Sequence, residues 1–72
     1  MNFVEIISFA KVYSVALGLD DKRVLSKMDL DIASEFLKKS ADEFPYWNQS
    51  QRDVYKFLTD FIKETLKEQI DG

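Results

Sequence analysis

Two short acidic clusters, Asp20-Asp21 and Asp29-x-Asp31, are the groups in this sequence best suited to hold a metal ion. A calcium-binding EF-hand loop requires oxygen ligands at alternating positions, a central glycine and a glutamate at its twelfth position. Neither cluster has that arrangement, and the chain has no histidine or cysteine for a zinc or transition-metal site. Aspartates in such positions are also common helix caps. We therefore expect no metal and no cofactor, with these carboxylates acting as caps and solvated surface.

Six serines are the candidate nucleophiles, but no histidine is present to activate any of them. Acid–base catalysis by paired carboxyl groups needs a pocket that shifts their pKa values. A chain of 72 residues has little room for such a pocket. The sequence thus predicts a protein that is not an enzyme.

The basic residues form two small groups, Lys22-Arg23 with Lys27, and Lys38-Lys39. A DNA-binding helix-turn-helix presents basic and polar amide side chains together on one helix. The segments 32–44 and 49–69 each carry several acids that phosphates would repel. Nucleic acid is therefore not the expected partner. The alternative is a small DNA-associated regulator whose basic patch forms only in three dimensions.

The elements that position these residues are expected to be helices, because the chain has only two glycines and one proline. Apolar residues make up 46% of the sequence, enough for the core of one helical domain over residues 1–72. A domain this small often needs an additional stabilising element. Without cysteine or histidine, oligomerisation is the element that remains.

The first helix is expected over residues 3–17, with Asn2 and Glu5 as a capping box and Gly18 as the left-handed residue that ends it. Its β-branched residues would also suit a strand, but strict alternation is absent. A helical wheel places most of its large apolar residues on one broad face, which we expect to be the core face. This face consists of Phe3, Ile6, Ile7, Phe9, Ala10, Tyr13 and Leu17.

The second helix is expected over residues 30–44, beginning after Ser26 with Asp29 or at Asp29 alone, and ended by Pro45. The segment 21–27 is either a short extra helix or an ordered connection, and the pattern leaves both open. Apolar residues at helical spacing mark the buried side of the second helix. They are Ile32, Ala33, Phe36, Leu37, Ala41 and Phe44.

The third helix has the clearest pattern, over residues 49–69, with Asn48 and Gln51 as its capping box. Short connections favour antiparallel neighbours, so the sequence predicts an all-α fold, a compact bundle of three main helices. The buried stripe of the third helix is predicted to contain Val54, Tyr55, Leu58, Phe61, Ile62, Thr65 and Leu66.

Four aromatic residues lie near one flank of the third helix, and two of them are candidates for a binding surface. We expect Trp47 and Phe61 in the core, and Tyr46 and Phe57 partly exposed, as aromatic anchors of protein interfaces often are. The alternative is that the segment 19–27 covers these two residues.

The first helix also carries a second apolar stripe, opposite its broad face, consisting of Val4, Ser8, Val12 and Val15. A surface helix of a globular domain normally has one apolar face. The second stripe therefore indicates either a contact with another chain or a helix buried at the centre of its own fold.

Taken together, these features predict a small acidic, non-enzymatic protein interaction or regulatory module. It is expected to form a homodimer or to dock on a larger protein through apolar helix surface. The apolar stretch 3–19 is interrupted by Glu5 and Lys11 and is too short to cross a membrane, so no membrane partner and a cytoplasmic location are expected. The predicted partner-binding residues are Val4, Ser8, Val12, Val15, Tyr46 and Phe57.

Overall fold

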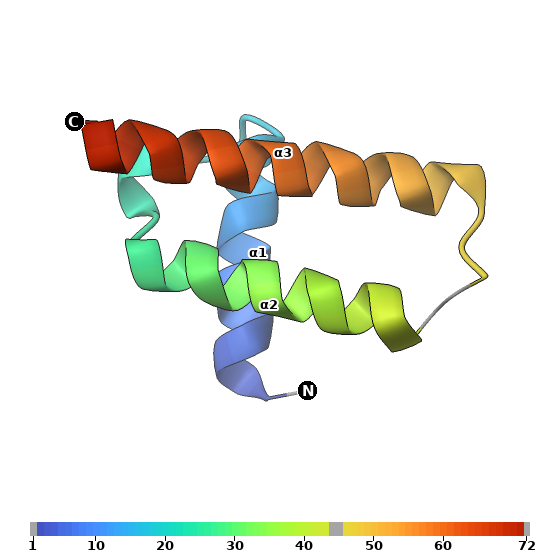
Figure 1. The fold of residues 1–72 in the computed structure, drawn as a ribbon. Helices are drawn as coiled ribbons and strands as arrows, with labels where there is room; N and C mark the ends of the chain where they lie inside the picture. The colour runs from blue at the N-terminus through green and yellow to red at the C-terminus, as the bar shows by residue number, and fades with distance from the viewer. Residues whose placement is uncertain (1, 44–45, 72) are drawn as a thin grey trace.

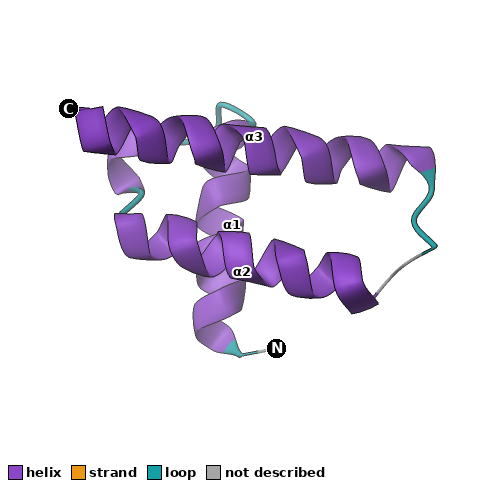
Figure 2. Cartoon of the chain, in the orientation of Figure 1, coloured by secondary structure: helices purple, strands orange, loops and turns teal. Residues whose placement is uncertain are grey.

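Three α-helices and one 3-10 helix form the chain in its computed structural model, which describes the backbone of residues 2–43 and 46–71 and side chains up to Gln69. Helices α2 and α3 run antiparallel in one layer, and α1 crosses behind both of them (Figures 1 and 2). No strand occurs within those ranges. The prediction of an all-α bundle of three main helices is confirmed. The elements are α1 (Phe3–Ala16), η1 (Lys22–Val24), α2 (Lys27–Glu43) and α3 (Gln49–Asp71).

The helix boundaries differ from the predicted ones by a few residues. Helix α2 begins at Lys27, three residues earlier than expected, because Ser26 caps it. The predicted end at Phe44 and the proline that follows it lie outside the described residues. The segment expected near 21–27 as a helix or a connection contains the 3-10 helix η1, and Asp21 caps it by accepting the Arg23 backbone N–H at 2.8 Å.

The predicted caps are present, except that the Glu5 carboxylate pairs with Lys39 instead of completing the capping box with Asn2. The Asn2 side chain accepts the backbone N–H of Glu5 at 2.8 Å. Asn48 and Gln51 form a reciprocal capping box, with both hydrogen bonds at 2.9 Å. Gly18 has φ +79°, a value that glycine adopts without strain, and it ends α1 as expected.

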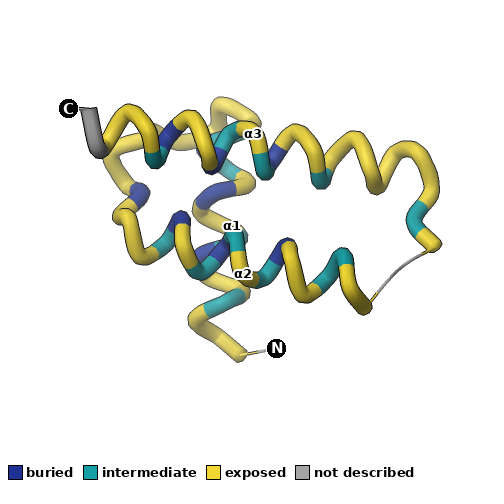
Figure 3. Tube along the Cα trace, in the orientation of Figure 1, coloured by how far each residue is buried: buried dark blue, intermediate teal, exposed yellow. Residues whose placement is uncertain are grey.

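The hydrophobic core lies where the three helices meet (Figure 3). Among the residues of α2, α3 and the segment between them that were predicted to be buried, Val54 is exposed, and the half-buried ones are Ile32, Phe36, Ala41, Trp47, Tyr55, Phe61 and Leu66. The fully enclosed apolar residues of the core are Val12, Val15, Leu25, Leu30, Ala33, Leu37, Leu58 and Ile62.

The prediction of which face of α1 is the core face was wrong. Val12 is 1% exposed, and Ser8 and Val15 are buried beside it. The broad face that was expected to be core points away from α2 and α3, with Phe3 81% exposed and Ile7 52% exposed. Phe9 alone of that set packs against the core. The stripe of smaller residues is therefore the inner side of the helix, and the larger residues form its outer side.

The size of the inner residues explains this orientation. Helix α1 crosses both α2 and α3, and residues such as Ser8, Val12 and Ala16 allow its backbone to approach them closely. A Phe or Ile at the same places would hold the helix away from the pair. Burial of the Ser8 hydroxyl costs little because it donates a hydrogen bond to Asp29 at 3.1 Å.

Truncating one residue on each face of α1 tests this orientation. In dilute protein, Val12→Ala is expected to lower the free energy of unfolding by about 2 kcal/mol, because it leaves a cavity in the core. Ile7→Ala removes more atoms but is expected to cost less than about 0.5 kcal/mol, because that side chain is already in solvent. Urea unfolding followed by circular dichroism measures both values. A larger cost for Ile7→Ala than for Val12→Ala would contradict the orientation.

Candidate interaction surface

The outer side of α1 is a continuous sector without a charged residue. At about 100° per residue, its members fall within roughly 120° of the helix circumference, opposite Ser8, Val12 and Val15. All are exposed except Ser14, which is half-buried. We call this sector the outer face of α1, and it consists of Phe3, Ile6, Ile7, Ala10, Tyr13, Ser14 and Leu17.

The two charged residues of α1 lie outside the outer face and are already paired within the chain. Glu5 lies on the inner half of the helix, and its carboxylate is 3.5 Å from the Lys39 ammonium of α2. Lys11 lies nearer the outer face, and its ammonium is 3.6 Å from the Asp29 carboxylate. Both pairs direct charge toward α2 and away from the outer face. A partner approaching this face therefore meets apolar surface on a helix whose own two charges are already compensated.

The exposed apolar area of the outer face is large for a domain of this size. The exposed fractions of its five large side chains, Phe3 to Leu17, correspond to on the order of 500 Å², taking roughly 200 Å² for each complete side chain. The largest apolar patch on a typical monomer covers about 300–600 Å² and is often functional. The outer face by itself reaches that range.

A second apolar feature is a groove of ≈ 660 Å³ between the C-terminal half of α2 and the N-terminal half of α3. Its aromatic lining includes Phe9, Phe36, Tyr46, Trp47 and Tyr55. The rings of Trp47 and Tyr55 meet edge to face at 5.4 Å, which fixes one side of the groove. Phe9 is the residue of α1 that lines the groove.

The structure does not bring the six predicted partner-binding residues together. Ser8, Val12 and Val15 are buried inside the same chain and are not part of its surface. Val4 is exposed and borders a small depression with Ile32 of α2. Tyr46, 95% exposed, lines the groove, whereas Phe57, 47% exposed, is not among its lining residues.

Sequence reasoning missed the outer face of α1 because it treated large apolar residues as core. The available signal was the absence of any charged residue across that sector, together with small residues opposite it.

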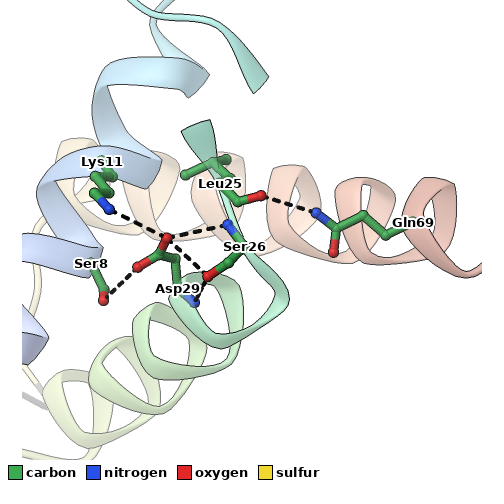
Figure 4. A network of polar contacts seen from close by, with 6 residues as sticks. All are labelled: Ser8, Lys11, Leu25, Ser26, Asp29 and Gln69. Atoms are coloured by element: carbon green, nitrogen blue, oxygen red, sulfur yellow. Dashed lines mark hydrogen bonds and ion pairs between the residues drawn. The ribbon is translucent and has the colours of Figure 1, made fainter. Parts of the chain in front are cut away.

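The Asp29 carboxylate joins α1 to the start of α2 (Figure 4). It accepts hydrogen bonds from the Ser8 hydroxyl at 3.1 Å and from the Ser26 backbone N–H at 3.2 Å, and it pairs with Lys11. Burial acts to raise the pKa of Asp29, but the hydrogen bonds from Ser26 and Ser8 and the charge of Lys11 outweigh it. The pKa therefore lies below its ordinary value.

The solvent side of α3 carries its charges in two stripes. At about 100° per residue, four basic residues share one stripe and four acids share the neighbouring one. Among the residues whose side chains are described, no ion pair involves any of these four bases. The basic stripe consists of Arg52, Lys56, Lys63 and Lys67, and the acidic stripe of Asp53, Asp60, Glu64 and Glu68.

Within the described part of the chain, no group of three or more His, Cys, Asp or Glu residues is arranged to hold a metal ion. No helix in that part is long and apolar enough to cross a membrane. No protein-family model, curated protein or solved structure matches the chain. The surface of the molecule is therefore the guide to its function.

Replacing Asp29 by Asn tests its role in joining α1 to α2. The variant is expected to lose about 1–2 kcal/mol of stability at pH 7, because it removes a charged acceptor from three partners. Since the folded-state pKa is below the ordinary 3.8, the contribution of Asp29 is complete above that value and is lost as the pH falls through the folded-state pKa.

The difference between the wild type and Asp29→Asn should therefore narrow in acid. Chemical unfolding at several pH values measures it, and Asp31→Asn, an exposed acid on the same helix, is the control. A difference that stays constant down to strongly acidic pH would show that the Asp29 charge contributes nothing.

Proposed function

We propose that this protein is a non-enzymatic protein interaction or regulatory module, acting in the cytoplasm, whose outer face of α1 docks on another polypeptide. The observation that carries the proposal is the uncharged apolar sector from Phe3 to Leu17, on the side of α1 opposite the core. Water-exposed apolar area of this size favours association, because removing it from water is worth about 25 cal/mol per Å².

The shape of this surface supports a helix as its partner element. Its side chains lie along one side of a helix of 14 residues and its C-cap Leu17, with the small Ala10 near the middle. A small residue at the centre of a helix face lets a second helix approach closely, while larger residues on either side fill the space around it. Tyr13 and Phe9, whose ring centroids are 6.0 Å apart, extend the apolar surface toward the groove.

Photo-cross-linking from the outer face tests the proposal. A benzophenone amino acid at Phe3, in the protein expressed in its own cells, is expected to give covalent adducts with a polypeptide, because this side chain would lie inside the contact. The same amino acid at Met28, 68% exposed at the start of α2, serves as the control. Adducts from Met28 with none from Phe3 would contradict the proposal, and the mass of the adduct identifies the partner.

A second candidate function, a DNA-associated regulator, is favoured by the basic stripe of α3. Lys56 and Lys63 lie two turns apart on that stripe, on the solvent side of the helix. Lys and Arg side chains in such a row can contact successive phosphates of a nucleic-acid backbone. The acidic stripe beside it opposes this function, and five other bases form ion pairs with acids of the chain. Those bases are Lys11, Lys22, Arg23, Lys38 and Lys39.

Fluorescence anisotropy with labelled duplex DNA at low salt tests the second candidate. If the four basic residues contact phosphates, the logarithm of the binding constant should fall with the logarithm of salt concentration with a slope of about −3 to −4. Lys56→Glu with Lys63→Glu should then abolish binding, while Lys38→Glu should leave it unchanged. The absence of binding at low salt would exclude this function.

A further inference from the structure

We propose that the polypeptide docked on the outer face of α1 is a second copy of this chain, in a symmetric dimer with Ala10 at the two-fold axis. This inference rests on the proposed function, since it uses the same face. It adds the identity of the partner, the centre of the contact and the symmetry of the assembly.

The spacing of the apolar residues along the outer face is typical of a helix that packs against another helix. Phe3, Ile6, Ala10, Tyr13 and Leu17 follow one another at intervals of three, four, three and four residues. This 3.5-residue repeat keeps apolar side chains along one seam between two helices, as in coiled coils. The repeat covers two heptads, about the length of α1.

The charge distribution favours a second copy over a charged partner. The seam carries no charge, and the two charged residues of α1 outside it, Glu5 and Lys11, have partners on α2. A partner selected by charge would need unpaired charges on α1 to recognise. A second copy instead presents the same neutral apolar strip, which a two-fold axis places against the first.

The buried area is sufficient for a dimer. Complete covering of the outer face on two copies removes at most about 1,000 Å² of apolar side chain from water, which meets the lower limit for a specific interface. Association would also stabilise the fold, because a chain of 72 residues without cysteine buries only a limited core. With Ala10 at the centre, the two helices approach closely, and Ile6 and Tyr13 lie on either side of the axis.

Sedimentation equilibrium of the purified chain, from low to high micromolar concentration, tests the dimer. The wild type is expected to reach twice the monomer mass, and Ile6→Glu is expected to raise the dimer Kd by at least about tenfold, because Ile6 lies on the seam beside the axis and two glutamates would be buried at the contact. Phe57→Glu places the same charge on a similarly exposed apolar residue of α3 and is expected to leave the Kd unchanged. Circular dichroism checks that both variants remain helical.

A monomer mass for the wild type at every concentration would overturn the inference, as would a dimer whose Kd is unchanged by Ile6→Glu. The first outcome leaves the proposed function testable by itself, because adducts from Phe3 to a different protein would still support docking on this face. Adducts from Phe3 to a second copy support both.

A disulfide at the axis tests the geometry. The chain has no cysteine, so Ala10→Cys introduces a single thiol on an exposed residue. In the dimer the two thiols are held together at millimolar effective concentration, so air oxidation should be at least about tenfold faster than for the exposed control Lys63→Cys on α3. Equal oxidation rates of the two variants would contradict the placement of Ala10 at the axis.

Discussion

The contact between Ser8 and Asp29 determines how the rest of the molecule is arranged. Helix α1 is apolar on both sides, so burial of apolar area alone does not select which side packs on α2 and α3. Two features make this selection: the small inner residues permit a close crossing, and Asp29, which caps α2 through Ser26, accepts the Ser8 hydroxyl at 3.1 Å. Turning α1 to its other side would leave the Asp29 carboxylate with fewer partners at the edge of the core. The polar contact thus fixes the rotation of an otherwise ambiguous helix.

The surface of the protein follows from that rotation. With the small residues inside, the aromatic and aliphatic residues from Phe3 to Leu17 are left in water. Glu5 and Lys11 stabilise the same orientation by pairing with Lys39 and Asp29, and these pairs leave the outer face without charge. The cost of exposing this apolar area is recovered only when another polypeptide covers it. The fold and the proposed docking therefore have one physical origin, the inward position of Ser8.

Local signals predicted the helices well and the rotation of α1 poorly. Asn2, Asn48 and Gly18 act within a few residues of the chain, so their capping roles were visible in the sequence. The early start of α2 was missed because the sequence allowed two N-terminal caps, Ser26 together with Asp29 or Asp29 alone. The structure has the first, with reciprocal hydrogen bonds between Ser26 and Asp29. The rotation of α1 depends on a contact between residues 21 positions apart, which helical periodicity does not report.

The sequence indicated excess apolar surface on α1 but placed it on the wrong side of the helix. The sequence showed that α1 has more apolar surface than one face requires, and this excess is the reason to propose docking. The wheel assigned the larger residues to the core, although a helix crossing two others at close range needs small residues at the crossing. Tyr46 and Phe57 were correctly expected to be exposed, but they belong to different parts of the surface.

Nuclear Overhauser effects between methyl and ring protons in dilute, monomeric protein test the rotation of α1 most directly. The structure predicts contacts from the Val12 and Val15 methyl groups to the core leucines of α2 and α3, and none from Ile7 to those leucines. If Ile6 and Ile7 showed these contacts and the valines did not, the opposite side of α1 would be the core side. The outer face, and the docking proposed for it, would then not exist.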